Sequence, residues 1–108
     1  MFDEFTKNKI LSGEKTVTRR LVRNNKRPAI PGSVHKIKID RSSKTYGYIE
    51  IKSVYQELLG DLKSSDAKKE GFDSIWQYFD YFFRVNNVNS LNVAVWVVEF
   101  KKINYKGE

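Results

Sequence analysis

Residues 34–55, VHKIKIDRSSKTYGYIEIKSVY, decide the fold class, because they hold two alternating segments with only a polar turn between them. In residues 34–40 the isoleucines share one face of an extended strand and the lysines share the other. Residues 46–55 alternate again, and residues 41–44 form the polar turn, so we predict a β-hairpin. A parallel α/β fold would need a helix between successive strands, and the class is therefore α+β.

Upstream of this hairpin, residues 15–21 alternate and are rich in Thr and Val, which predicts a strand. A loop at residues 23–33 follows, with three cations and no acid. Its Pro31-Gly32 pair suits the centre of a type II turn, because proline fixes φ and glycine tolerates positive φ. Before the strand, apolar residues at Phe2, Phe5 and Ile10 indicate a short helix that Gly13 can end.

Downstream of the hairpin, two helices and one strand are predicted. Residues 64–70 read as a short helix closed by Gly71, and Ser74 can cap a second helix whose apolar and aromatic residues recur at helical spacing up to Phe83. The asparagine-rich residues 86–92 end it. Residues 93–100 are apolar on both faces, which is typical of a strand buried on both sides. The element order favours one small, curved or closed sheet with flanking helices.

Length and composition are consistent with one globular domain spanning residues 1–108. No apolar run in the chain approaches the length of about eighteen residues that is needed to cross a bilayer. The first residues also lack the basic region followed by an apolar region that is typical of a secretory signal, so we expect none. It has no cysteine, so disulfides and thiolate chemistry are excluded and the cytoplasm is the expected compartment. With one histidine and no cysteine we expect no metal site, and we expect no cofactor.

Positive charge is concentrated in the first part of the chain. The net charge is +7, and the first 45 residues hold twelve of the twenty Lys and Arg residues but only four of the thirteen acids. Such a cluster attracts phosphates through counterion release, so RNA or a nucleotide-like ligand is the expected partner. Two alternatives stay open: a basic surface that only keeps the protein in solution, and an interaction module for a protein with an acidic surface.

Residues 13–20, GEKTVTRR, place a lysine, two threonines and two arginines at a helix-to-strand junction. Arginine offers planar bidentate donors to phosphate, lysine a point charge, and threonine a hydroxyl that can donate a hydrogen bond or act as a nucleophile. The alternative is an exposed strand of ordinary composition. Candidate ligand contacts in this motif are Thr16, Arg19 and Arg20.

These residues resemble the ASCH domains, which are small PUA-like β-barrels. The similarity follows the order Gly-x-Lys-Thr-x-Thr-x-Arg at 13–20, Pro31-Gly32 before a strand, Ala-Lys-Lys-Glu-Gly-Phe at 67–72 before a helix, and Val-Val-Glu-Phe at 97–100. The resemblance implies an α+β, PUA-like barrel with flanking helices. It also implies a cleft where the first motif meets Glu70, and a role in RNA or nucleoside handling.

One similar branch, the small bacterial ASCH amidohydrolases, removes the acetyl group of N4-acetylcytidine. The resemblance implies that Lys15, Thr18 and Glu70 are the catalytic residues. A neutral Lys15 would take the proton of Thr18, the resulting alkoxide would attack the amide carbonyl, and Glu70 would handle protonation of the leaving group. The basic loop and the long aromatic helix depart from that branch.

The competing interpretation of the basic half is binding without catalysis, in which cations neutralise phosphates and an aromatic ring stacks on a base. The predicted phosphate contacts are Lys15, Arg19, Arg20, Arg23, Lys26 and Arg27. Tyr46 or Tyr48 is the predicted stacking residue. His35 is expected in a hydrogen-bonded structural role, and Trp76 or Tyr78 could line a base pocket at the edge of its helix.

Overall fold

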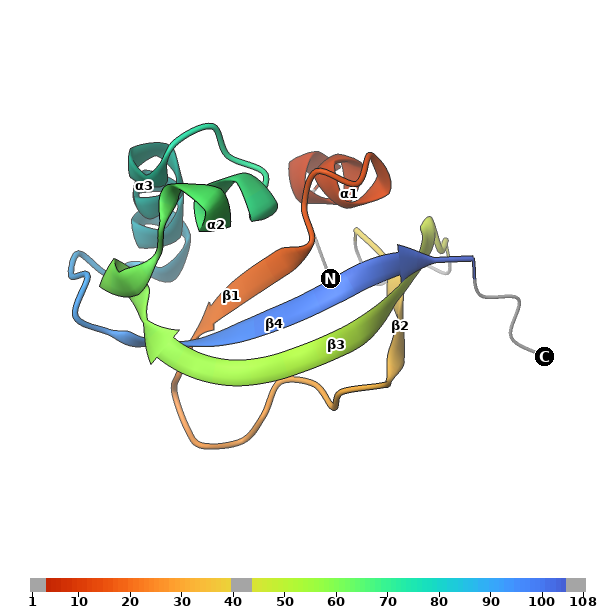
Figure 1. Cartoon of the computed structure of the whole chain (residues 1–108), viewed down its shortest axis with the longest axis horizontal. Coiled ribbons are helices and arrows are strands. Elements are labelled where there is room, and N and C mark those ends of the chain that lie inside the picture. Colours follow the sequence, from red (N-terminus) through yellow and green to blue (C-terminus); the bar gives the residue numbers. More distant parts are fainter. Residues whose placement is uncertain (1–3, 40–43, 105–108) are drawn as a thin grey trace.

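A curled, four-stranded antiparallel sheet forms the centre of the computed structural model, which describes residues 4–39 and 44–104 (Figure 1). The strand order is β1-β4-β3-β2. The predicted hairpin is confirmed, since β2 pairs antiparallel with β3. Residues 40–43 of its turn, and Phe2 of the predicted first helix, lie outside the described residues. The strands are β1 (Val17–Leu21), β2 (Val34–Ile37), β3 (Gly47–Leu58) and β4 (Ala94–Ile103).

Strand β4 is central, and the prediction that it is buried on both faces is confirmed. It pairs with β1 along one edge and with β3 along the other. Val95 and Val97 point to one face of the sheet and Trp96 and Val98 to the other, and all four are buried. Because both edges and both faces are covered, β4 anchors the strand that carries the Lys15-to-Arg20 motif.

The sheet curls because β3 is long and irregular. A bulge shifts the β3–β4 register between Ile51 and Ser53, and a bulge bends its strand and increases the twist. Strands β1 and β2 are therefore the two edges of a half-barrel, and residues 22–33 run from one edge to the other (Figure 1). The predicted turn in this loop is confirmed: Gly32 has φ 89° and Ser33 N–H donates to the Ile30 carbonyl at 3.0 Å.

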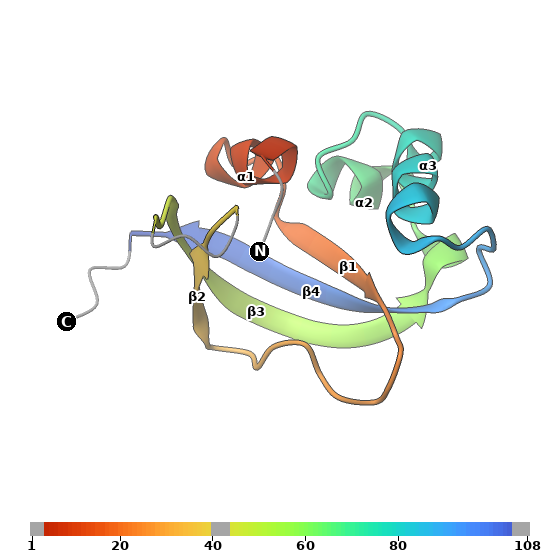
Figure 2. The same ribbon diagram turned by 180° about the vertical axis from the view of Figure 1, so that it is seen from behind.

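Helices α1, α2 and α3 are all drawn above β4 in Figures 1 and 2, but α2 and α3 pack on one face of the sheet whereas Ile10 of α1 packs into the half-barrel. Ser74 caps α3 by accepting a hydrogen bond from the Gln77 N–H, as predicted. Gly71, which has φ 93°, follows the last residue of α2 and its cap. The predicted α+β class, with a small barrel-like sheet and flanking helices, is confirmed. The helices are α1 (Glu4–Leu11), α2 (Ser64–Lys69) and α3 (Ile75–Asn86), with a short 3-10 turn at Leu59–Asp61.

Apolar packing divides into two clusters on opposite faces of the sheet. Beneath α2 and α3, side chains of β1 and β4 pack against helix residues, including Val17, Val97, Tyr78, Phe79 and Phe82. Inside the half-barrel, Ile10 of α1 joins Ile37, Ile49, Ile51, Val98 and Phe100. Along β1, Val17 therefore belongs to the cluster beneath the helices, whereas Thr18 pairs with Val98 of the half-barrel cluster.

Helix α1 buries a different set of residues from the one its apolar spacing suggests. Thr6 and Lys7 are buried together with Ile10, whereas Phe5 is half exposed at the edge of a cleft. Lys7 Nζ lies 4.4 Å from the centre of the Tyr46 ring, and this cation–π contact accounts for its burial. No helix within the described ranges is long and apolar enough to cross a membrane.

Candidate functional site

A cleft of about 620 Å³ lies between α1, α3, strand β1 and the start of the basic loop. Three of its walls come from segments that are distant in the chain. Lys15, Thr18 and Glu70, which the resemblance implies as catalytic residues, all line it. The structure therefore brings the motif at residues 13–20 together with the segment that ends α2.

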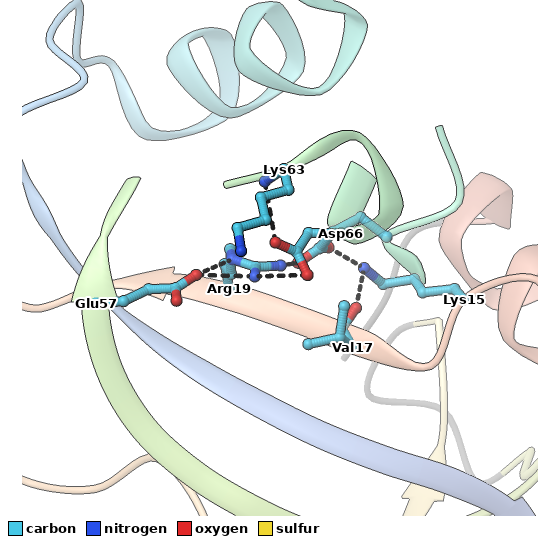
Figure 3. Close-up of polar contacts among 7 residues, drawn as sticks. Lys15, Val17, Arg19, Glu57, Lys63 and Asp66 are labelled. Carbon is cyan, nitrogen blue, oxygen red and sulfur yellow. Dashed lines mark hydrogen bonds and ion pairs between the residues drawn. The ribbon is translucent and has the colours of Figure 1, made fainter. Parts of the chain in front are cut away.

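The floor of the cleft is a buried carboxylate held by two cations. Lys15 Nζ donates to Glu70 Oε1 at 2.6 Å. It also donates to the Val17 carbonyl at 2.8 Å (Figure 3). Arg19 Nη1 donates to Glu70 Oε2 at 2.9 Å. Glu70 is 2% exposed, and the positive charges of Lys15 and Arg19 compensate its buried negative charge.

Local backbone geometry brings Glu70 to this position. Lys15 and Glu70 form an antiparallel β-bridge, and the Thr16 N–H donates to the Lys69 carbonyl at 2.8 Å. Gly71 then turns the chain with φ 93°, and a Cβ there would meet the Lys9 side chain at 3.3 Å. The positive φ favours glycine at this position, and a Cβ there would also crowd the Lys9 side chain.

Arg19 is held from the other side by residues that the sequence did not indicate. Its Nη2 donates to Glu57 Oε1 at 2.9 Å, and Asp66 Oδ1 lies 4.0 Å away (Figure 3). Burial alone would lower the pKa of Arg19, but the charge of Glu70 and the hydrogen bonds that Arg19 donates to Glu57 and Glu70 outweigh it and raise that pKa. Arg19 is thus a clamp on Glu70, with its own side chain only 2% exposed.

Aromatic side chains form one wall of the cleft. Burial, and then the negative charge of Glu70, raises the pKa of the Tyr78 phenol. Of the two aromatic residues suggested for a base pocket, Tyr78 lines the cleft, whereas Trp76 is 70% exposed and does not. The wall comprises Phe5, Phe72, Tyr78, Tyr81, Phe82 and Trp96.

The rim of the cleft is basic. Arg20, Arg23 and Lys26 line it, and none of the three forms an ion pair with any residue in the described ranges. Thr18 lines it as well, and its hydroxyl makes no hydrogen bond within the part of the chain that the structure describes. The rim can therefore present free cations and a hydroxyl to a ligand.

Four of the predicted ligand contacts lie away from the cleft. Thr16 and Arg27 are exposed but are not among its lining residues. Tyr46 packs between Lys7 and Lys44, whose Nζ atoms lie 4.4 and 4.9 Å from the ring centre, and Tyr48 pairs with Lys36 across the hairpin. The register of the hairpin sets both tyrosines apart from the cleft.

The two remaining sequence expectations concern histidine and metal ions. His35 Nε2 hydrogen-bonds with Ser33 Oγ at 2.8 Å, as the structural interpretation expects, although its side chain is exposed. Among residues 4–39 and 44–104, no group of three or more His, Cys, Asp or Glu residues could hold a metal ion.

Comparison with known proteins identifies the family. The ASCH domain model matches residues 1–105, so the chain belongs to the ASCH domain family. No curated protein matches the sequence.

Solved structures show the same PUA-like fold. An ASCH domain from Lactobacillus crispatus superposes with a TM-score of 0.75 at 20% identity, over 94% of this chain and 72% of that one. A protein from Enterococcus faecalis superposes with a TM-score of 0.71 at 18% identity, over 96% of this chain and 74% of that one. A mutant of ZmASCH from Zymomonas mobilis superposes with a TM-score of 0.63 at 24% identity, over 95% of this chain and 71% of that one.

Proposed function

We propose that this ASCH domain binds RNA or a modified pyrimidine nucleoside in the cleft between α1, α3 and β1. The observation that carries the proposal is the composition of that cleft: an aromatic wall, a rim of cations that form no ion pair among the described residues, and a buried charged floor. Aromatic faces stack on bases, and free cations pair with phosphates.

The floor supports recognition of a base edge. A lysine ammonium has three donors, and Lys15 uses two of them, on Glu70 and on the Val17 carbonyl. The third is available for an acceptor atom such as a base carbonyl. The Tyr78 phenol adds a second polar group at the aromatic wall.

The test of binding is a titration with single-stranded RNA at several salt concentrations. Each lost phosphate contact lowers the slope of log K against log salt by about 0.7. Replacing Arg20, Arg23 and Lys26 together by alanine should therefore reduce the slope by about 2 units and weaken binding. The matched control replaces Lys52, Lys68 and Lys69, which are exposed and outside the cleft. Equal effects of the two triple variants would contradict a specific rim.

A second candidate function is hydrolysis of an amide, such as the acetyl amide of N4-acetylcytidine. The observation that favours it is that Lys15, Thr18 and Glu70 line the same cleft, with Lys15 Nζ only 2.6 Å from Glu70. That distance permits a proton to pass from Lys15 to Glu70, which would leave a neutral amine. The amine could then accept the Thr18 proton as the hydroxyl oxygen attacks the carbonyl, and the leaving amine would take the proton held by Glu70. The acetyl group would remain on Thr18 as an ester, which a water molecule would then hydrolyse to acetic acid and free Thr18.

Release of cytidine from N4-acetylcytidine tests this reaction. Thr18→Ala should abolish turnover, Thr18→Ser should retain part of it because the hydroxyl remains, and Lys15→Ala should abolish it. Thr45→Ala, which changes a threonine outside the cleft, is the control. Unchanged turnover in Thr18→Ala would rule out the nucleophile, and absence of turnover in the unmodified protein would leave binding as the function.

A further inference from the structure

A second, smaller hollow of about 140 Å³ lies at the open side of the half-barrel, and we call it the mouth pocket. All four strands contribute to its lining, and Pro28 and Ala29 of the basic loop lie against it. Strands β1 and β2 are the two edges of the sheet, so the pocket occupies the place where a fully closed barrel would continue its hydrogen bonding.

The mouth pocket combines an apolar floor with a cationic rim. Its floor is made by buried residues of β3 and β4, among them Ile51 and Phe100. Arg20, His35 and Lys36 also line it, and none of the acidic residues within 4–39 and 44–104 does. Within the described ranges neither Arg20 nor Lys36 forms an ion pair, so both charges are available to an anion.

The mouth pocket and the cleft meet at strand β1. Arg20, Thr18 and Pro28 line both hollows. Side chains alternate along β1, so Arg19 points toward the helices whereas Thr18 pairs with Val98 of the half-barrel core. Because β1 is an edge strand, no further strand separates the two hollows. A linear ligand can therefore continue from one to the other over this edge.

We propose that the mouth pocket binds a second nucleotide of a single-stranded RNA whose neighbouring nucleotide occupies the cleft. A water molecule has a share of about 30 Å³ in the liquid, so the pocket has room for about five waters, or for one planar ring. The ring would lie on the apolar floor, and its phosphate would lie at the rim beside Arg20 and Lys36. This inference rests on the proposed binding function and adds that the ligand is a polynucleotide, not a free nucleoside.

The test compares the four 5′-mononucleotides with the corresponding single-stranded homotetranucleotides. Occupation of two linked sites should make the best tetranucleotide bind tighter than its mononucleotide by about tenfold or more. Lys36→Glu should remove that gain and leave mononucleotide affinity within about twofold, because Lys36 lines only the mouth pocket. Lys52→Glu, with the same change of charge outside both hollows, should retain the gain.

A second variant tests the floor independently of charge. Ala29→Leu should partly fill the mouth pocket and weaken tetranucleotide binding alone, with circular dichroism and thermal unfolding confirming that the fold is retained. Mononucleotides that bind as tightly as tetranucleotides would overturn the inference and leave the proposed function intact. No binding by either ligand would overturn both. Equal losses in Lys36→Glu and Lys52→Glu would also overturn it, since they would indicate charge without a site.

Discussion

Glu70 is the residue on which the cleft depends. It lies at the end of a six-residue helix, yet both of its oxygens face cations from the β1 segment, Lys15 and Arg19. An isolated buried carboxylate would be strongly unfavourable, and here two buried partners compensate it. The charged network therefore links the α2 end to the sheet as well as shaping the site.

Removing the charge of Glu70 should destabilise the protein strongly. Glu70→Gln leaves Lys15 and Arg19 buried without their shared anion, and breaking a buried pair in this way costs about 3–5 kcal/mol of unfolding free energy. Urea unfolding measures this change. The control is Glu14→Gln, whose carboxylate accepts from Lys9 Nζ at 2.9 Å but is exposed. Water screens that pair, so its loss should leave stability nearly unchanged. Similar small effects in both variants would contradict the structural role of Glu70.

At the scale of elements, α3 joins the apolar core to the cleft. One side of the helix packs Phe79 and Phe82 into the core beneath it, and Tyr78 lies beside the Glu70 network. The helix starts at the Ser74 cap, and Asn87 ends it in the left-handed conformation with φ 53°. These local signals determine its length, and thereby which aromatic residues reach the cleft.

Because α3 buries the Tyr78 phenol, we predict that the folded protein loses stability at alkaline pH. Burial and the charge of Glu70 raise the pKa of Tyr78 above the ordinary value of about 10. The contribution of the Tyr78 phenol to the free energy of unfolding is complete below about pH 10. It is lost as the pH rises, because the unfolded chain releases the phenol proton while the folded chain retains it. Thermal unfolding of Tyr78→Phe between about pH 9 and pH 11 should therefore show a smaller decrease than the unmodified protein.

The control for this pH dependence is Tyr81→Phe. Tyr81 lies on the same helix and lines the same cleft, but it is only partly buried. The alkaline decrease in stability should be smaller in Tyr78→Phe than in Tyr81→Phe. If Tyr78→Phe and the unmodified protein lose stability in parallel, the buried phenol does not titrate with unfolding.

At the scale of the whole molecule, the positive charge of the first 45 residues is divided between two uses. Lys15 and Arg19 form ion pairs with the buried carboxylate of Glu70, and Lys7 packs on the Tyr46 ring. Exposed cations remain around the two hollows, among them Arg23 and Lys36. The salt dependence proposed above therefore belongs to the rims and not to the cationic motif as a whole.

Sequence patterns alone determined the elements and the fold class. Alternation, helical spacing, the Pro31-Gly32 turn, the Ser74 cap and the Gly71 stop are all local signals, because they depend on φ and ψ and on hydrogen bonds between near neighbours. The resemblance of ordered motifs to ASCH domains placed Lys15, Thr18 and Glu70 in one site, and the three do line one cleft.

Only the tertiary structure decided which faces these residues present and which partners they meet. Glu57 reaches Arg19 through the register of β3 on β4, two strands away from β1. Tyr46 packs against Lys7 of α1 and does not line the cleft, and residues of all four strands together with Ala29 line the mouth pocket. The physical reason is that register and curl are set by contacts between distant segments, which no local pattern encodes.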